Sequence, residues 1–491
     1  MMEEFLRGQG PFSIEFSVSG EDAVRVTRAD GQARVQVGAK EARTLFQKAT
    51  AAGIRLWSAD AATAEEAHRT FIVKCGSPRL FDGRTADRTM APGKGKEAPP
   101  ADRVRAVVTS FNELPPQVKQ HIVDVEAESS LWRTRANQGY RVDSGGMQRE
   151  RQSRHRLLDG FTRDLGLDVR RQDIARLPFL RTFGDALTVT QTTAYGWSHP
   201  SAVTADIEAM NDDQKQLWAA YKAAHSVLKR AQILDSWHRR LTVEGRLHPV
   251  IHANSAATGR MSMSGAALQS APKELRHLIL TEPGNSCVSV DHTSAELKVL
   301  AAFLNDAAFT ALIATGDIYQ VLADESGLER KQAKVATLAF VYGQSLRSLG
   351  RTLGADAASQ FHAAIRHVLP QVPAWQREMA DRGKRGQDFQ TLTGRPLPRL
   401  AEPGRTGQVP NLLIQGSARD AFGVAVRRTV ATLGADVLFI PLHDELFIEV
   451  PRAQTANASM ALVSAMTVEV APGVVLSGTA EVTQGRWADR P

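Results

Sequence analysis

The spacing of apolar and polar positions divides the chain into three stretches. In the first 82 residues apolar positions alternate with polar ones in short runs, which is the spacing of half-buried strands. This spacing predicts strands at 12–18, 24–27, 34–37 and 54–57, and a helix at 39–52. The first stretch is therefore expected to form a small α+β domain.

The second stretch, residues 83–102, is polar and rich in Gly and Pro, with little apolar surface to bury. Such a composition predicts an interdomain linker. From residue 103 onward the spacing is mostly helical, with one long helix expected at 212–241. Short strand patterns interrupt the helices at 247–251, 287–291 and 437–450. The sequence shows no internal repeat.

Two of these strand patterns end in carboxylates. Residues 437–450 read as two apolar strands around the triplet His443, Asp444 and Glu445. The strand at 287–291 ends in Asp291, and a helix pattern follows at 294–303. Two carboxylates at neighbouring strand ends can share a pair of divalent ions ~4 Å apart for phosphoryl transfer. The alternative is a pair of strand-end acids with ordinary structural partners.

A helix pattern beginning near Leu328 carries a second group of candidate residues. Arg330, Lys334, Leu338 and Tyr342 follow one another at intervals of four, so they share one slowly drifting stripe of the helix. Two cations suit a triphosphate, and an apolar and an aromatic side chain suit a base and a sugar. An amphipathic surface helix with a basic edge would show the same pattern.

Two further segments carry polar side chains suited to nucleic acid. The segment 258–264 combines a Gly-containing turn with Arg260, whose guanidinium can bond a phosphate or a base edge, and Gln269 follows it. Asn411 and Gln415 lie one helical turn apart, and paired amides can bond minor-groove acceptors. A polar loop and a polar helix face are the alternatives.

Composition supports a polyanionic partner without demanding one. The 491 residues include 60 Lys and Arg against 53 Asp and Glu, a formal net charge of +7, which a solvated basic surface would also explain. Only two cysteines are present, so neither a disulfide framework nor a cysteine zinc site is indicated. The start lacks a secretory signal pattern, and no apolar run reaches membrane-spanning length. We therefore expect a cytoplasmic protein with no membrane partner.

The order of these segments along the chain is more informative than any one of them. The ordered segments are Thr258-Gly-Arg260, Asp291 with Glu296-Leu-Lys298, Arg330 with Lys334 and Tyr342-Gly343, Gln415-Gly-Ser-Ala418, and His443-Asp-Glu445. Together they closely resemble the polymerase domain of family A DNA polymerases, the DNA polymerase I family, over about residues 105–490. Residues 137–143 resemble the segment that leads into the thumb of that family.

The resemblance implies an α+β fold shaped as a right hand, with an antiparallel palm sheet and helical fingers and thumb. The polymerase domain would span 103–490, the thumb about 113–245, and the palm and fingers 246–490. The fingers themselves would span about 310–400. A monomer is expected.

The resemblance also implies a reaction and its metal ions. Asp291 and Asp444, with the main-chain carbonyl of His292, would bind two Mg²⁺, for which Mn²⁺ could substitute, and Glu445 would be a supporting acid. The protein would add dNTPs to a primer 3′-hydroxyl on a DNA template. Its expected partners are therefore primer–template DNA and dNTPs, in replication or repair in a bacterium or a phage-infected cell.

The remaining site residues follow from the same resemblance. The nucleotide would meet Arg330, Lys334, Leu338, Tyr342, Glu296, His292 and Tyr319. The primer–template would meet Arg260, Gln269, Arg276, Asn411, Gln415 and His443. Glu296 would lie under the sugar, exclude a 2′-hydroxyl and accept a hydrogen bond from Tyr342. Single-subunit RNA polymerases share the hand but lack this glutamate, so an RNA-synthesising relative is disfavoured, as is a non-catalytic nucleic-acid-binding descendant.

Four positions depart from the family pattern. His292 replaces Tyr, Tyr319 replaces His, Leu338 replaces an aromatic residue that stacks on the incoming base, and Lys298 replaces Arg. The first strand also lacks the Asp-x-Glu pair of the family's proofreading exonuclease. Residues 1–82 are therefore expected to be an inactive exonuclease remnant or an unrelated module, and no proofreading is expected.

Overall fold

The computed structural model describes most of the chain after residue 115 and five short strands before it. The described residues are 12–16, 23–28, 34–38, 56–58, 80–82, 116–170, 180–189, 203–205, 209–254, 256–344, 346–397 and 406–489. The helix expected at 39–52 and the linker expected at 83–102 lie outside these residues.

The five N-terminal strands form one mixed sheet in the order β3-β2-β1-β4-β5. They are β1 (Phe12–Phe16), β2 (Ala23–Arg28), β3 (Arg34–Gly38), β4 (Leu56–Ser58) and β5 (Leu80–Asp82). Strands β1, β2 and β3 pair antiparallel, whereas β4 pairs parallel to β1 and to β5. The four strand predictions are confirmed to within two residues at the ends that the structure describes. Strand β5 was not predicted from the sequence.

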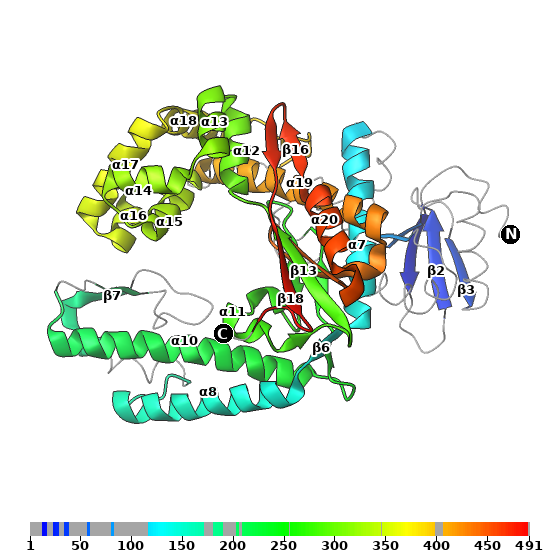
Figure 1. Ribbon diagram of the computed structural model, residues 1–491, viewed down its shortest axis with the longest axis horizontal. Helices are drawn as coiled ribbons and strands as arrows, with labels where there is room; N and C mark the ends of the chain where they lie inside the picture. The colour runs from blue at the N-terminus through cyan, green and yellow to red at the C-terminus, as the bar shows by residue number, and fades with distance from the viewer. Residues whose placement is uncertain are drawn as a thin grey trace.

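A four-stranded antiparallel sheet lies at the centre of the molecule, in the order β14-β15-β13-β18 (Figure 1). Its strands are β13 (Asn285–Asp291), β14 (Leu438–Leu442), β15 (Glu445–Pro451) and β18 (Ala480–Gln484). All five residues of β14 and five of the seven in β13 are buried, which explains the apolar runs in the sequence. The strands predicted at 287–291 and 437–450 are confirmed.

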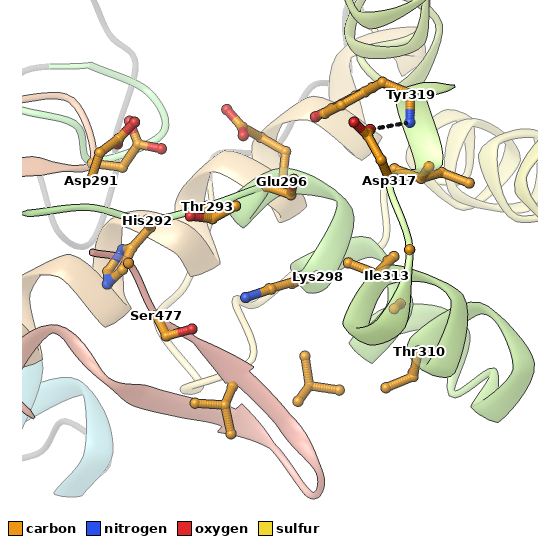
Figure 2. A pocket seen from close by; sticks show the side chains of 18 of the residues that line it. Asp291, His292, Thr293, Glu296, Lys298, Thr310, Ile313, Asp317, Tyr319 and Ser477 are labelled. Atoms are coloured by element: carbon orange, nitrogen blue, oxygen red, sulfur yellow. Dashed lines mark hydrogen bonds between the residues drawn. The ribbon is translucent and has the colours of Figure 1, made fainter. Parts of the chain in front are cut away.

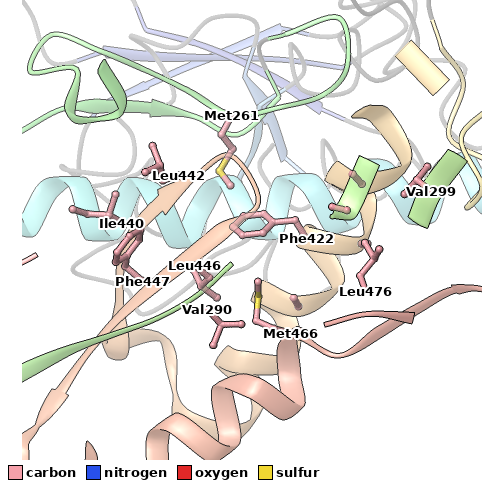
Figure 3. Packing of buried hydrophobic residues seen from close by; sticks show 14 of the residues in the cluster. Met261, Val290, Val299, Phe422, Ile440, Leu442, Leu446, Phe447, Met466 and Leu476 are labelled. Carbon is pink, nitrogen blue, oxygen red and sulfur yellow. The ribbon is translucent and has the colours of Figure 1, made fainter. Parts of the chain in front are cut away.

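Two C-terminal helices, α19 (Val409–Leu433) and α20 (Thr455–Met466), complete the core around this sheet. Helix α20 packs against β13, β15 and β18, and α19 packs against α20. Phe422 and Met466, from the two helices, meet Val290 and Leu446 of the sheet in one buried cluster (Figure 3). Burial of apolar side chains of this size contributes about 1.5–3 kcal/mol each, so the cluster holds the strand ends rigidly.

Two groups of helices extend from the central sheet toward the left of Figure 1, one in the upper and one in the lower part of the view. One group is α12 (Ala295–Leu304), α13 (Ala307–Thr315), α14 (Ile318–Ser326), α15 (Arg330–Val341), α16 (Leu346–Leu353), α17 (Ala355–Val368) and α18 (Gln371–Lys384). The other is a pair of long helices that run side by side, α8 (Ser144–Leu165) and α10 (Asp212–Arg240). Helices α13–α18 and the pair α8–α10 fall within about the ranges expected for fingers and thumb, whereas α12 precedes the range expected for the fingers.

Helix α10 confirms the long helix predicted at 212–241. Asn211 and Gln214 form a capping box at its start, which satisfies two of the free backbone N–H groups there. Asp235 of α10 accepts hydrogen bonds from Arg151 at 2.6 Å and His155 at 3.1 Å, both on α8. These bonds and a separate apolar core that includes Leu158 hold the two helices together.

The long helix α7 and several short elements connect these parts. They are α7 (Pro116–Gln138), β6 (Tyr140–Val142), β7 (Leu187–Val189), β8 (Val203–Ala205), β9 (Arg246–Leu247), β10 (Val250–His252), β11 (Ser262–Ser264), α11 (Lys273–Arg276), β12 (Ile279–Leu280), β16 (Val468–Ala471) and β17 (Val474–Leu476). The strand predicted at 247–251 is thus two short strands, β9 and β10. No helix among the described residues combines the length and apolar character that crossing a lipid bilayer requires.

Candidate active site

The two predicted catalytic acids lie side by side at one edge of the central sheet. Strand β13 ends at Asp291, which pairs in register with Glu445, the first residue of β15. Only His443 and Asp444 connect β14 to β15, and the His292 N–H donates to the Asp444 carbonyl at 3.4 Å. His443 adopts a φ of +60°, a conformation that hairpin turns usually assign to Gly. The surrounding sheet therefore imposes this turn on the chain.

Burial and mutual repulsion make this carboxylate group electrostatically unfavourable in the protein alone. Burial raises the pKa of Asp291 to about 7, and the charges of Asp444, Glu445 and Glu296 act in the same direction. Burial and the charge of Glu296 raise the pKa of Asp444 to about 6. Burial also raises the pKa of Glu445. A bound cation would relieve this concentration of negative charge.

The available ligands suit an open Mg²⁺ site better than a structural metal site that is closed by protein side chains. Among the described residues, no three or more His, Cys, Asp or Glu side chains are arranged to hold a metal. Mg²⁺ needs no such cage, since proteins usually bind it through one or two carboxylates plus substrate phosphates and water. Asp291 and Asp444 supply two carboxylates of this kind.

A cavity of about 840 Å³ opens beside the two acids. Eight of the predicted site residues line it: Asp291, His292, Glu296, Tyr319, Arg330, Lys334, Leu338 and Asp444. In Figure 2, Glu296 lies between Asp291 on one side and Asp317 and Tyr319 on the other, and Lys298 extends between α12 and the β16–β17 hairpin. The fold thus brings residues from β13, α12, α14, α15 and the β14–β15 turn to one space.

The predicted contact between Glu296 and Tyr342 is present. The Tyr342 hydroxyl donates to Glu296 Oε1 at 2.7 Å, and Arg260 Nη2 lies 3.4 Å from the same oxygen. Burial and the Glu296 charge raise the pKa of Tyr342, so the phenol stays protonated and can donate. A hydrogen bond between Gln415 and Tyr342 ties α19 to this group.

Arg330 and Lys334 stand at the start of α15, and Tyr319 supports both of them. The Tyr319 ring is 5 % exposed and lies 6.0 Å from the Arg330 guanidinium and 5.5 Å from Lys334 Nζ. Arg330 Nε also donates to Asp317 Oδ2 at 2.5 Å. Burial raises the pKa of Tyr319 to about 12, so its ring offers the two cations a neutral π-face.

The side chain of His292 is buried and makes a structural contact. Its imidazole is 2 % exposed, and Nε2 lies 2.7 Å from the Met466 carbonyl at the end of α20. Burial lowers its pKa, so the ring is neutral and Nε2–H donates this bond. The imidazole is thus engaged with α20, and the metal and nucleotide contacts of His292 stay predictions, of which the metal contact concerns its main-chain carbonyl.

The residues predicted to meet DNA fall into two places. Arg260, Arg276 and His443 are close enough that both arginines, after burial itself, lower the pKa of His443. Gln269 Nε2 donates to the Pro441 carbonyl at 3.2 Å, which places Gln269 against β14. Asn411 joins Gln415 on the first two turns of α19, and its Oδ1 is buried with no hydrogen-bond partner in the described structure.

One wall of the cavity was missed at the level of sequence. The β16–β17 hairpin and the residues after it contribute Gly473, Val474, Val475, Ser477, Gly478 and Thr479. The Ser477 carbonyl accepts the Thr293 N–H at 2.9 Å. A methyl group added at Gly478 would overlap the main-chain oxygen of Asp291 and lie 2.9 Å from its carbonyl carbon. None of these side chains is charged, so no pattern in the sequence pointed to them.

Comparison with known proteins is consistent with this geometry. The family description that matches residues 180–489 is DNA polymerase family A. The DNA polymerase of Mycobacterium phage L5 is 31% identical over 251 residues, which are 50% of this chain and 42% of that protein. The thermostable DNA polymerase I of Thermus filiformis is 31% identical over 245 residues, which are 44% of this chain and 29% of that protein. The chain thus covers less than half the length of these relatives.

A solved structure resembles the whole fold. The polymerase domain of Pol1 from M. smegmatis, in complex with DNA primer-template and dNTP, superimposes with a TM-score of 0.76 at 17% identity, covering 99% of this chain and 96% of that one. The expected α+β right hand is therefore confirmed. With the family match extending over residues 180–489, the chain belongs to DNA polymerase family A.

Proposed function

We propose that the protein is a template-directed DNA polymerase that adds dNTPs to a primer 3′-hydroxyl. The observation that carries this proposal is that Asp291 and Asp444 lie close together at the edge of a cavity of about 840 Å³ that Arg330 and Lys334 also line. Carboxylates and cations in one cavity suit nucleotidyl transfer, in which a metal-bound triphosphate is held by basic side chains.

Asp291, Asp444 and the main-chain carbonyl of His292 would hold two Mg²⁺ ions, for which Mn²⁺ could substitute. Bound there, the ions would lower the pKa of the primer hydroxyl and neutralise charge on the triphosphate and the leaving pyrophosphate. Glu445 lies directly opposite Asp291 in the sheet and adds negative charge beside these ligands. Its role is to support the site rather than to complete it.

The chain's own residues would bind and select the nucleotide. Arg330 and Lys334 lie in the first turns of α15, where the helix dipole adds to their charge, so this end of the helix favours the triphosphate. Leu338, two turns along, would contact the base. Glu296, fixed by Tyr342, would block a 2′-hydroxyl and so favour deoxynucleotides.

The primer–template would lie against the minor-groove residues Arg260, Gln269, Arg276, Asn411, Gln415 and His443. We assign the thumb to about 113–245, the palm and fingers to 246–490 and the fingers to about 310–400. The helix pair α8–α10 and the group α13–α18 support this division, since they form two separate groups of helices, one in the lower and one in the upper part of Figure 1.

Primer extension with purified protein and Mg²⁺ tests the proposal. We expect dNTP incorporation by the wild type and a loss of about a thousandfold or more in Asp291→Ala and Asp444→Ala, since metal ligation contributes several kcal/mol to such reactions. Asp436→Ala is the matched control, because this exposed aspartate lies outside the cavity. Absence of extension, or equal rates in all four proteins, would refute the proposal.

We also propose that the protein lacks 3′–5′ proofreading and that residues 1–82 are an exonuclease remnant or an interaction module. Strand β1 carries a single acid, Glu15, where a proofreading site needs a pair. A labelled primer with a mismatched 3′ end should stay intact with Mg²⁺ in the absence of dNTPs. Trimming of that end, abolished by Glu15→Gln, would contradict the proposal.

A further inference from the structure

Two arginines, Arg395 and Arg419, are buried behind the active site, each beside an acid. Arg395 is 1 % exposed, and its Nε donates to Asp420 Oδ1 at 2.7 Å. Arg419 is 5 % exposed, and its Nη2 donates to Oε2 of the fully buried Glu128 at 2.9 Å. Buried ion pairs contribute little net stability compared with apolar side chains of the same volume. Their presence here therefore needs an explanation beyond stability.

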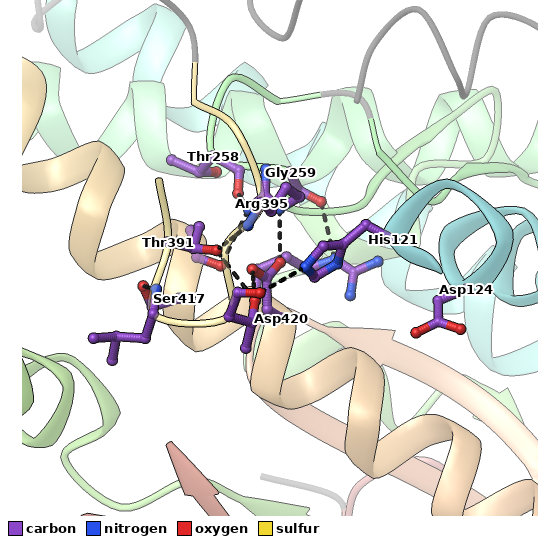
Figure 4. A network of polar contacts seen from close by, with 12 residues as sticks. His121, Asp124, Thr258, Gly259, Thr391, Arg395, Ser417 and Asp420 are labelled. Atoms are coloured by element: carbon purple, nitrogen blue, oxygen red, sulfur yellow. Dashed lines mark hydrogen bonds and ion pairs between the residues drawn. The ribbon is translucent and has the colours of Figure 1, made fainter. Parts of the chain in front are cut away.

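Both guanidinium groups also bond the main chain of one turn. Arg395 Nη2 donates to the Thr258 carbonyl at 2.9 Å, and Arg419 Nε donates to the Gly259 carbonyl at 2.9 Å. Arg419 Nη2 also donates to the carbonyl of Ala253, the residue after strand β10, at 3.1 Å. Figure 4 shows the Arg395 side chain between this turn and Asp420. The consecutive carbonyl groups of Thr258 and Gly259 are thus each held by one arginine.

Glycines make room for both guanidinium groups. A Cβ at Gly259, whose φ is +80°, would lie 3.0 Å from the Arg395 guanidinium, and one at Gly416 would lie 3.2 Å from Arg395 Nη2. A Cβ at Gly423 would lie 2.7 Å from Arg419 Nη1. The three glycines and the two arginines therefore form one close-packed unit. Such packing allows the turn little freedom to shift.

The residue that follows the turn is Arg260, which reaches Glu296. Arg260 Nη2 lies 3.4 Å from the Glu296 oxygen that also accepts the Tyr342 hydroxyl. Any shift of the Thr258 and Gly259 peptides would therefore move the Arg260 guanidinium relative to Glu296.

We propose that Arg395 and Arg419 are positioning residues for sugar selection: by fixing the Thr258 and Gly259 carbonyls they hold Arg260 against Glu296. The inference rests on the proposed function, in which Glu296 excludes the 2′-hydroxyl. Arginine is required at both positions because each guanidinium donates to an acid and to a carbonyl at once. Lysine would keep the charge beside the acid but has a single nitrogen to share between the two directions.

Arg395→Lys and Arg419→Lys test the proposal, with kcat/KM measured for a dNTP and for the matching rNTP. We expect the preference for the dNTP to fall about tenfold in each variant, equivalent to about 1.4 kcal/mol. Arg427→Lys is the matched control. Arg427 lies on α19, as Arg419 does, and it also pairs with an acid, Asp124, at 3.0 Å. Unchanged selectivity in both lysine variants, or an equal loss in the control, would overturn the proposal.

A double-mutant cycle separates positioning from a general structural effect. In an Arg260→Ala background, Arg395→Lys should change selectivity by less than twofold, because the residue through which it acts is gone. A full tenfold effect in that background would contradict the proposal. If Arg395→Lys does not fold, Thr393→Val serves instead, since Thr393 Oγ1 donates to Asp420 Oδ2 at 2.7 Å. This milder change should lower selectivity about threefold.

Hydrogen exchange gives a readout that does not depend on catalysis. The Gly259 amide donates to the Ala256 carbonyl at 2.8 Å, and peptides covering 256–261 should exchange faster in both lysine variants than in Arg427→Lys. Unchanged exchange would overturn the positioning role whether or not the protein extends primers. Faster exchange without primer extension by the wild type would refute the proposed function and leave the positioning role supported.

Discussion

Replacing Gly478 by Ala places a methyl group against the main chain of Asp291, one of the two acids that we propose to bind Mg²⁺. The new Cβ would overlap the Asp291 carbonyl oxygen and lie 2.9 Å from the Asp291 carbonyl carbon and from Val290 Cγ1. Non-bonded carbon atoms settle at ~3.5–4.0 Å. Either the segment after β17 or the end of β13 must therefore move by more than about 0.6 Å, the difference between ~3.5 Å and 2.9 Å, because the overlap with the carbonyl oxygen is closer still.

We expect this displacement to lower the reaction rate strongly but to reduce the unfolding free energy only moderately. Overpacking of this kind typically costs about 1–3 kcal/mol of unfolding free energy. A misplacement of about 1 Å at reacting groups can cost about a hundredfold in rate. Because β13 is paired on both sides, by β15 and β18, the strand cannot yield without disturbing Asp444. We therefore expect kcat/KM to fall about 10–100-fold while the protein stays folded.

Single-turnover primer extension over a range of Mg²⁺ concentrations measures the first effect, and urea unfolding measures the second. Gly160→Ala is the control, since a Cβ at this helical position meets no atom within 4 Å and should add about 0.5–1 kcal/mol of stability. The Mg²⁺ concentration for half-maximal rate should rise in Gly478→Ala alone. If Gly478→Ala kept the wild-type rate, Mg²⁺ dependence and stability, the close approach of Gly478 to Asp291 would not matter for activity, and the reasoning would be refuted.

Three further predictions concern the same cavity. Tyr342→Phe removes the 2.7 Å bond to Glu296, so the preference for dNTP over rNTP should fall about 5–10-fold, as for a hydrogen bond of about 1–1.5 kcal/mol; paired kcat/KM measurements would show this. Leu338→Phe supplies a stacking face of about 0.5–1.5 kcal/mol, so the dNTP KM should fall about 2–10-fold; an unchanged KM would place Leu338 away from the base. Burial raises the pKa of Asp291 to about 7 and of Asp444 to about 6, so the folded, metal-free protein binds protons that the unfolded chain releases above about pH 4. Its melting temperature in EDTA should therefore fall as the pH rises from about 4 to 7, and Mg²⁺ should restore it most above pH 7; a melting curve independent of Mg²⁺ at pH 8 would refute this.

The sequence by itself determined the elements and the candidate chemistry where local spacing is informative. Alternation and apolar runs located the strands that end at Asp291 and flank Asp444, and the spacing of four located helix α15. These signals are local, since a strand or a helix must bury one face whatever the rest of the chain does. The order of the segments then identified the family, and with it the Glu296–Tyr342 bond.

Only the tertiary structure decided which further distant groups touch. Glu128 and Arg419, which are 291 positions apart, meet beneath the turn that carries Arg260, and Gly478 packs on Asp291. Neither contact leaves a trace in local periodicity, because each depends on how separate helices and strands pack together. For the same reason the sequence could name His292 as a site residue but could not show that its imidazole faces the end of α20. The sequence thus determined what the chain carries to the active site, and packing decided how those groups are held there.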